Sequence, residues 1–244
     1  MQMSHIFQNI KERIIFQYKA SHHNGFGIHS PYLFRLISDV LEGTCPYYCF
    51  DQIESTRPLL KKELKTFHKN NKTDAFCGQI LFRLIQDTQS RILLEIGTTA
   101  GLETQYMAFS SQKAKCVSIT DSVELAEVLQ NNNEKKELKN IELKILESGE
   151  TLESRINQLD SIDFVYFNES VGILTMADLF NQCLLKKNNG SIFVLNKIHV
   201  DSEKKKVWKK IQMYPDVRVT LDLYDLGIVL FNPNLEKNNY VIRL

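Results

Sequence analysis

Short apolar runs alternate with helically spaced apolar residues from residue 92 onward. A continuous apolar run of about four to eight residues fits a strand buried on both faces of a parallel sheet, and apolar residues three or four positions apart fit a helix packed on it. The pattern predicts strands at 92–95, 116–119, 141–146, 164–167 and 192–195. It predicts helices at 102–109, 123–130, 152–159, 173–186 and 201–214. Such alternation indicates an α/β fold with a mostly parallel sheet.

The C-terminal part of the chain breaks this alternation. Apolar segments at 217–223 and 226–231 are separated by only a few residues, too few for the crossover that joins parallel strands. We therefore expect an antiparallel hairpin, followed by a strand at 240–244. The residues of 226–231 are apolar without alternation, so this strand should lie inside the sheet and not at its edge.

Helical spacing dominates the chain before residue 88. A first helix is expected over 5–20, and Ser30 followed by Pro31 is a typical helix start that Gly43 can end. A third helix is expected over 51–67, with Pro58 kinking or restarting it, and a fourth over 75–86. The sequence thus predicts an N-terminal helical extension, 1–88, and an α/β domain, 89–244.

One strand ends in an acid and a glycine-containing turn. The segment 92–104 has the spacing E-x-G-x-x-x-G, in which Glu95 precedes Gly97 and Gly101. The glycines allow the backbone to approach a ligand at the carboxyl end of the strand, where open α/β sheets bind nucleotides. The spacing differs from the dinucleotide pattern G-x-G-x-x-G. Two glycines four positions apart also occur in plain strand-to-helix turns, so the spacing alone leaves both interpretations open.

This segment resembles motif I of class I S-adenosylmethionine (SAM) methyltransferases. In that family the acid and the glycine loop contact the methionine and ribose parts of the cofactor. The resemblance implies that SAM is the cofactor and that Glu95, Gly97, Thr98 and Gly101 bind it. The family's sheet consists of parallel units closed by an antiparallel hairpin, so the resemblance also implies a Rossmann-like methyltransferase fold.

Two further segments, 25–32 (GFGIHSPY) and 222–229 (DLYDLGIV), are similar to a subfamily of bacterial SAM-dependent methyltransferase-like proteins, and this resemblance covers nearly the whole chain. In that subfamily the fourth and fifth strands end in acids, at positions similar to those that hold the divalent metal of catechol-type O-methyltransferases. This chain has Asn168 after the fourth strand and Asn196 with Lys197 after the fifth. Amides and a lysine do not supply the negative charge that hard cations require, so no metal is expected.

Three more candidate site residues lie near strand ends. Asp121 stands one position beyond the place where methyltransferases commonly have a ribose-binding acid, and it is equally well placed to cap the helix from 123. Glu169 and His199 are candidates for a metal-free acid–base pair. A glutamate in a loop is more often solvated, and a lone histidine near a helix start is more often structural. Both interpretations therefore stay open.

Composition limits the function classes. The chain has 244 residues, 43% of them hydrophobic, which suffices for a full core. A formal net charge of +1 gives no reason to expect nucleic acid or an anionic membrane as a partner. We find no 18-residue apolar run and no signal peptide, and the five scattered cysteines fit reduced thiols, so a cytoplasmic location is expected.

The sequence therefore predicts metal-independent, SAM-dependent methyl transfer to a small molecule. The alternative is a degenerate relative that binds a nucleotide-like ligand or a protein partner without turnover. The glycine loop after Glu95 favours the first, whereas Asn168, Asn196 and Lys197 favour the second. A nucleic-acid methyltransferase is disfavoured because the sequence has no N/D-P-P-Y motif, and the lysine-rich stretch 204–206 fits a solvated helix face.

Overall fold

The structure is a computed structural model that describes residues 11, 13–18, 20, 27–58, 60, 75–98, 101–146, 150–168 and 175–244. Internal contacts divide the chain into two compact units. We call Thr44–Ser191 the middle unit, and Met1–Gly43 with Ile192–Leu244 the terminal unit. The strands follow the order β3-β2-β1-β4-β5-β7-β6-β8. Among the described residues, no helix is both long and apolar enough to cross a membrane.

Parallel strands form the centre of the middle unit. These are β1 (Ile92–Ile96), β2 (Lys115–Thr120), β3 (Ile141–Ile145) and β4 (Ile162–Phe167). β1 pairs in parallel with both β2 and β4, and β2 pairs in parallel with β3. Strand β1 is buried from its second residue onward, as its continuous apolar run predicts. All four of these strands were predicted from the sequence, and the parallel arrangement is confirmed.

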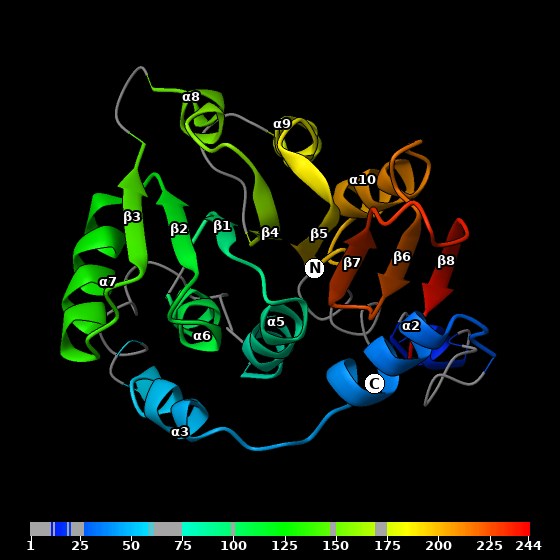
Figure 1. Cartoon of the computed structure of the whole chain (residues 1–244), viewed down its shortest axis with the longest axis horizontal. Helices are drawn as coiled ribbons and strands as arrows, with labels where there is room; N and C mark the ends of the chain where they lie inside the picture. Colours follow the sequence, from blue (N-terminus) through cyan, green and yellow to red (C-terminus); the bar gives the residue numbers. More distant parts are fainter. Residues whose placement is uncertain are drawn as a thin grey trace. The chain divides into compact units, whose positions relative to one another are not determined.

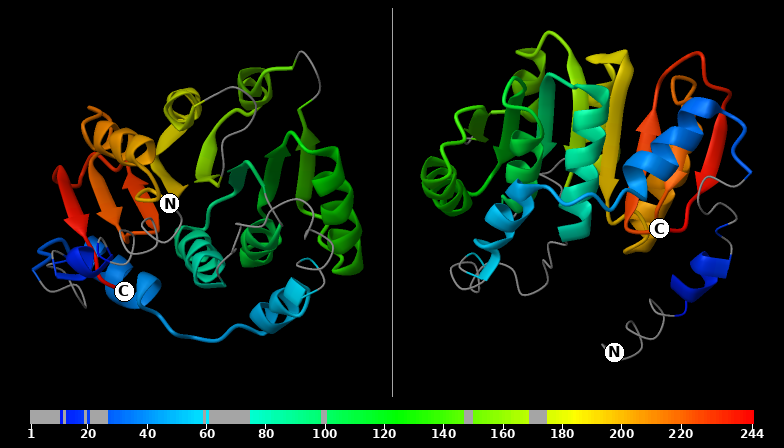
Figure 2. Two further views of the ribbon diagram at one scale, coloured as in Figure 1. Left: turned by 180° about the vertical axis from the view of Figure 1, so that it is seen from behind. Right: turned by 60° about the horizontal axis from the view of Figure 1, so that its bottom comes forward.

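Helices cover both faces of these strands (Figure 1). On one face lie α5 (Ala75–Thr88), α6 (Leu102–Ser110) and α7 (Val123–Lys135), and on the other lie α8 (Leu152–Asn157) and α9 (Met176–Leu184). Figure 2 shows the same two layers from behind. This coverage explains why strand residues in β1 and β4 are apolar on both sides.

Helix α3 (Tyr48–Glu54) packs on α6 and on the middle of α5 through aromatic rings. Phe50 contacts Phe82 and Tyr106 with ring centroids 5.1 and 5.3 Å apart. The Tyr106 hydroxyl donates a hydrogen bond to Glu54 Oε1 at 2.8 Å. The structure divides the helix that was predicted over 51–67. α3 begins earlier, at Tyr48, and ends at Glu54, and helical geometry resumes at Arg57 and Pro58. Proline suits that restart because its fixed φ fits a first helical turn.

The strands of the terminal unit are mostly antiparallel. They are β5 (Lys187–Asn196), which enters this unit at Ile192, β6 (Val219–Asp222) and β7 (Leu226–Leu230), with β8 (Asn238–Val241) parallel to β6. β6 and β7 form the predicted hairpin, and β7 pairs on its other side with β5. The prediction that the strand around 226–231 lies inside the sheet is confirmed. Every residue of β7 is buried.

Two helical elements lie on opposite faces of these strands (Figure 1). α10 (Ser202–Gln212) starts at Asp201, whose side chain accepts a hydrogen bond from the Lys204 backbone N–H. α2 (Pro31–Arg35) starts at the predicted Ser30 cap and continues as a π-helix, Leu36–Leu41. The sequence predicted a helix from this start that Gly43 can end, without indicating the π-helical part. Its buried residues Leu36, Ile37, Val40 and Leu41 have the spacing of an ordinary amphipathic helix, so the sequence did not indicate the wider turn.

Candidate cofactor site

The carboxylate of Glu95 lies fully buried near the carboxyl end of β1. Its Oε2 accepts a hydrogen bond from the Ser118 hydroxyl on β2 at 2.8 Å and another from the Thr104 hydroxyl on α6. The other oxygen, Oε1, is buried and has no hydrogen-bond partner among the described residues. A buried carboxylate oxygen without a donor is unfavourable, so this atom is suited to a ligand that brings a donor.

Burial raises the pKa of Glu95, because removing a carboxylate from water disfavours its charged form. The hydroxyls of Thr104, Ser118 and Thr98 and the amide of Asn168 oppose this increase by stabilising the negative charge. A cationic group next to Oε1 would lower the pKa further. A positively charged ligand group at this position would stabilise the charged form of the carboxylate.

Both glycines of the loop after β1 have a positive φ, a backbone conformation that favours glycine. Gly97 has φ +79°, and its N–H donates to the Ile119 carbonyl at the end of β2 at 2.9 Å. Gly101 has φ +70° and starts α6. A Cβ on Gly101 would lie 1.6 Å from Leu129 Cδ2 of α7. Glycine is required at 101 by its left-handed conformation and by this close packing.

An amide side chain, that of Asn168, follows β4 and lies near Glu95. Asn168 is 2% exposed, and its backbone N–H donates to the Ile96 carbonyl at 3.0 Å. Its Oδ1 accepts a hydrogen bond from the Tyr166 hydroxyl at 3.4 Å, and that hydroxyl lies 3.3 Å from Cys77 Sγ. Burial raises the pKa of Tyr166 well above its usual range, so the phenol stays a neutral donor. Asn168 is thus held beside Glu95 as an uncharged group.

Asp121 lies just beyond the end of β2 and is exposed. The structure shows that Ser122 caps the next helix, because its Oγ accepts the Leu125 backbone N–H at 3.3 Å. The capping role that the sequence left open for Asp121 therefore belongs to its neighbour. Binding of the ribose hydroxyls by Asp121 stays a prediction.

The remaining candidates lie in the terminal unit or outside the described residues. His199 Nε2 lies 2.7 Å from Asp222 Oδ2, and its ring stacks on Tyr224 at a centroid distance of 5.2 Å. Lys197 has φ +54°, and its N–H donates to the Asp225 carbonyl. Glu169 lies outside the described residues, so its pairing with His199 stays a prediction.

Asp222, which lies within hydrogen-bond distance of His199, is a partner of a predicted site residue that the sequence interpretation missed. Its only signal was its place at the start of the segment 222–229, which the resemblance had already singled out. His199 and Asp222 are 23 positions apart in the sequence, so local residue spacing does not predict their contact.

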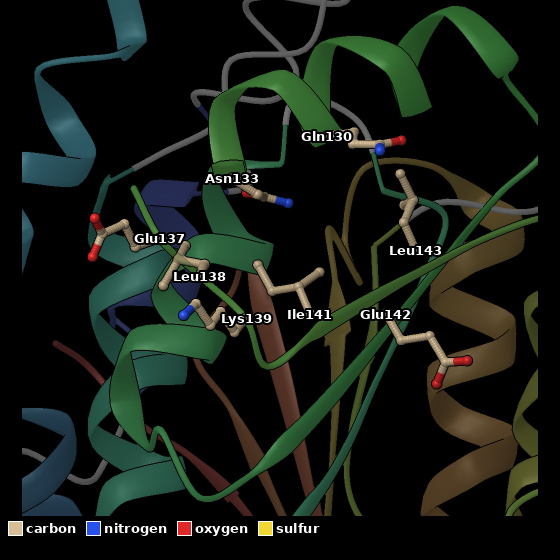
Figure 3. A pocket seen from close by; sticks show the side chains of 8 residues that line it. All are labelled: Gln130, Asn133, Glu137, Leu138, Lys139, Ile141, Glu142 and Leu143. Carbon is tan, nitrogen blue, oxygen red and sulfur yellow. The ribbon is translucent and has the colours of Figure 1, made fainter. Parts of the chain in front are cut away.

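One cavity of about 680 Å³ lies between α7 and the start of β3. Figure 3 shows Asn133, Leu138, Ile141 and Glu142 around it. The residues that line it include none of the predicted site residues within the described part of the chain. It also lies by the amino end of β3, whereas ligands of parallel α/β sheets bind at carboxyl ends. The cavity is therefore separate from the candidate cofactor site.

Comparison with solved structures places the fold in a class. An O-methyltransferase from Bacillus cereus in complex with S-adenosylhomocysteine (SAH) is 17% identical, with a TM-score of 0.60 over 78% of this chain and 94% of that chain. A methyltransferase from Geobacter sulfurreducens is 12% identical, with a TM-score of 0.60 over 80% and 96%. The O-methyltransferase TomG from Streptomyces achromogenes, solved with SAM, is 16% identical, with a TM-score of 0.57 over 82% and 94%. The fold is that of class I SAM-dependent methyltransferases.

Sequence comparison then gives the family. A model of the family described as lysine methyltransferase matches residues 56–212, well over half of the chain, and the chain belongs to this family. No curated protein matches the sequence. The predicted fold class and the predicted methyltransferase family are thus confirmed, and SAM is the cofactor. The buried oxygen Oε1 of Glu95, which has no hydrogen-bond partner among the described residues, fits this cofactor, whose methionine part carries an ammonium group.

Proposed function

We propose that the protein transfers the methyl group of SAM to a small molecule without a divalent metal. The observation that carries the proposal is the buried Glu95 carboxylate at the head of the glycine loop, whose Oε2 accepts two hydrogen bonds and whose Oε1 accepts none from the described residues. When bound, SAM supplies a sulfonium methyl group that a nucleophile can displace. Such transfer requires little more than alignment of the two reactants and exclusion of water.

The residues that would hold the cofactor are those of the loop and its neighbours. Glu95 would bind the ammonium group, Gly97 and Thr98 would follow the methionine part, and Gly101 would set the start of α6. Asp121 would bind the ribose hydroxyls from the end of β2. Thr104 and Ser118 keep Glu95 in place, because both donate to the same oxygen of its carboxylate.

Metal independence is proposed from the chemistry of the strand ends. Asn168 offers a neutral amide that already accepts from Tyr166, and Asn196 is followed by the ammonium of Lys197. Mg²⁺ and Ca²⁺ require oxygen ligands that include carboxylates, and a lysine nearby opposes them. No group of three or more His, Cys, Asp or Glu side chains suited to a metal occurs within the described residues.

The family match supports a second acceptor, the ε-amine of a lysine. A lysine amine must lose a proton before it can attack a methyl group, as must most oxygen nucleophiles, so both candidates require a base. Glu169 and His199 are the proposed acid–base residues. The small-molecule proposal is supported by the O-methyltransferases among the solved neighbours.

Methyl transfer from tritiated SAM tests the proposal. The chain is incubated with a panel of phenols, catechols, amines and carboxylic acids, and separately with a lysine-rich protein, each with EDTA and with added Mg²⁺. We expect label in at least one small molecule, with EDTA and Mg²⁺ rates equal within about twofold, because no dication is needed. Label only in the lysine-rich protein would favour the second acceptor, and a rate that requires Mg²⁺ would contradict the metal-free site. Binding of SAH with no transfer to any acceptor would identify the degenerate alternative.

A further inference from the structure

Strand β3 is the outermost strand of the middle unit. In the strand order β2 lies on one side of it, and no strand of the described residues lies on the other. The Asn140 carbonyl accepts an N–H of β2, and the Leu146 N–H donates to a β2 carbonyl, both at 2.9 Å. Backbone polar groups point alternately to the two sides of a strand, so those of Ile141, Leu143 and Ile145 face the open edge.

The cavity beside α7 follows this open edge. Its lining includes Ile141, Glu142 and Leu143, which are consecutive residues of β3. Figure 3 shows the side chains of Glu142 and Leu143 leaving the strand in opposite directions. Because successive side chains point to opposite faces and β2 covers the other edge, a cavity that touches all three residues lies along the open edge. Its volume of about 680 Å³ leaves room for the side chains of an added strand.

The open edge carries charges of both signs. Glu142 and Lys144 lie two positions apart on one face of β3, and Lys144 Nζ forms an ion pair with Glu142 Oε1. Lys115 Nζ of β2 lies 2.7 Å from Glu142 Oε2. Hydrogen bonds from Lys115 and Lys144 lower the pKa of Glu142, so this side chain is charged at neutral pH. Charges on an edge strand usually prevent pairing between copies, because like charges would meet.

On β3 the order of these charges has the opposite effect. The strand reads Ile-Glu-Leu-Lys-Ile, which is complementary to itself when one copy is reversed. If two copies pair antiparallel about Leu143, Glu142 stands opposite the partner's Lys144 on both sides of the centre. The outward backbone groups of Leu143 meet those of the partner's Leu143. The Glu–Lys positions then form the non-hydrogen-bonded pairs, in which the side chains are closest and opposite charges attract.

We propose that the open edge of β3 binds β3 of a second copy of the chain, in an antiparallel register centred on Leu143. The contact is isologous, because a two-fold axis between the two Leu143 residues gives each copy the same patch. The strands of the two middle units then join into one sheet. The cavity beside Ile141 lies next to the partner's Ile145, which stands opposite it in this register. The assembly does not depend on the proposed function.

An exchange of charges tests the interface. Sedimentation velocity at several protein concentrations, without SAM or an acceptor, should show dimers of the wild-type chain. Glu142→Lys alone or Lys144→Glu alone places like charges opposite each other at both symmetric positions, and each should weaken dimerisation at least about tenfold. The double variant Glu142→Lys with Lys144→Glu restores opposite charges and should dimerise within about threefold of the wild type. Glu203→Lys, at an exposed position of the terminal unit, is the control for the change in net charge.

Single cysteines test the register. Residues that exchange both hydrogen bonds in an antiparallel pair have Cα atoms about 5.5 Å apart, which is within the range of a disulfide. Leu143→Cys should therefore form a covalent dimer under mild oxidation, because the two copies of this residue meet at the two-fold axis. Lys139→Cys, at an exposed position away from the axis, should not. The wild-type chain gives the background, because its Cys45 is exposed.

Three results would overturn this interface. One is a wild-type chain that stays monomeric at high micromolar concentration. Another is dimerisation that neither single charge variant weakens, or that the double variant fails to restore although its circular dichroism spectrum shows it folded. The third is a Leu143→Cys chain that crosslinks no better than Lys139→Cys. If a charge variant does not fold, the comparison of the two cysteine variants decides.

Discussion

Replacing Glu95 with glutamine is expected to weaken SAH binding roughly 10- to 100-fold, because a hydrogen bond to a charged group contributes about 1.5–3 kcal/mol. The amide keeps the shape of the side chain, and its oxygen can still accept from Thr104 and Ser118. What is lost is the negative charge, together with the oxygen Oε1 that would meet the ammonium group in the proposed site. Isothermal titration with SAH measures the change.

The same substitution should leave the ligand-free protein folded. Burial raises the pKa of Glu95, so the folded state binds a proton more readily than the unfolded state, and the charged carboxylate lowers stability at neutral pH. Glu95→Gln should therefore unfold at an equal or higher temperature at pH 7, and its advantage should shrink as the pH falls and the wild-type carboxyl becomes protonated. Thermal unfolding at several pH values measures this difference.

Glu142 offers a matched control. It is a half-exposed carboxylate on β3, where it pairs with Lys115 and Lys144. Glu142→Gln should leave SAH affinity unchanged. Equal SAH affinity in Glu95→Gln and the wild type would mean that Glu95 does not contact the cofactor.

Gly101→Val is expected to reduce the free energy of unfolding by about 2–5 kcal/mol, the sum of backbone strain at positive φ and overpacking. The strain arises at φ +70°, and the overpacking arises where a Cβ would meet Leu129. For a chain of this length the melting temperature should fall by roughly 5–15 °C. The SAH-induced stabilisation should be lost too, because α6 could no longer start at this residue.

A double-mutant cycle separates the two causes. Gly101→Ala is compared alone and together with Leu129→Ala, which removes the atoms that the new Cβ would meet. We expect the double variant to lose at least about 1 kcal/mol less than the sum of the single losses. Additive losses would mean that the contact with Leu129 does not constrain Gly101.

Much of the fold could be predicted because its elements are local. Continuous apolar runs marked the strands, and the short gap after residue 223 required the hairpin. Bounds were less certain where polar residues join a strand. β5 starts at Lys187, before the predicted 192, because Asn188 donates to Asp163 at 2.8 Å and Ser191 donates to the Ile162 carbonyl at 2.6 Å. The domain boundary at residue 88 stays a prediction.

The site could be predicted only as far as a motif extends. The resemblance identified Glu95 and the glycines, but the donors to Glu95 come from β2 and α6. The contact between Gly101 and Leu129 and the one between His199 and Asp222 join residues far apart in sequence. Tertiary packing determines which residues form these contacts, and the local spacing of residues in the sequence does not reveal it.

Thermal unfolding with and without SAM and SAH tests the central claim, that the loop after Glu95 binds this cofactor. At about 100 times Kd either ligand should add about 2.7 kcal/mol to the stability of the folded state. For a chain of this length that corresponds to a rise in melting temperature of roughly 5–10 °C. The rise should be present in Glu142→Gln and absent or much reduced in Glu95→Gln. No rise with millimolar ligand in the wild-type protein would contradict a SAM site.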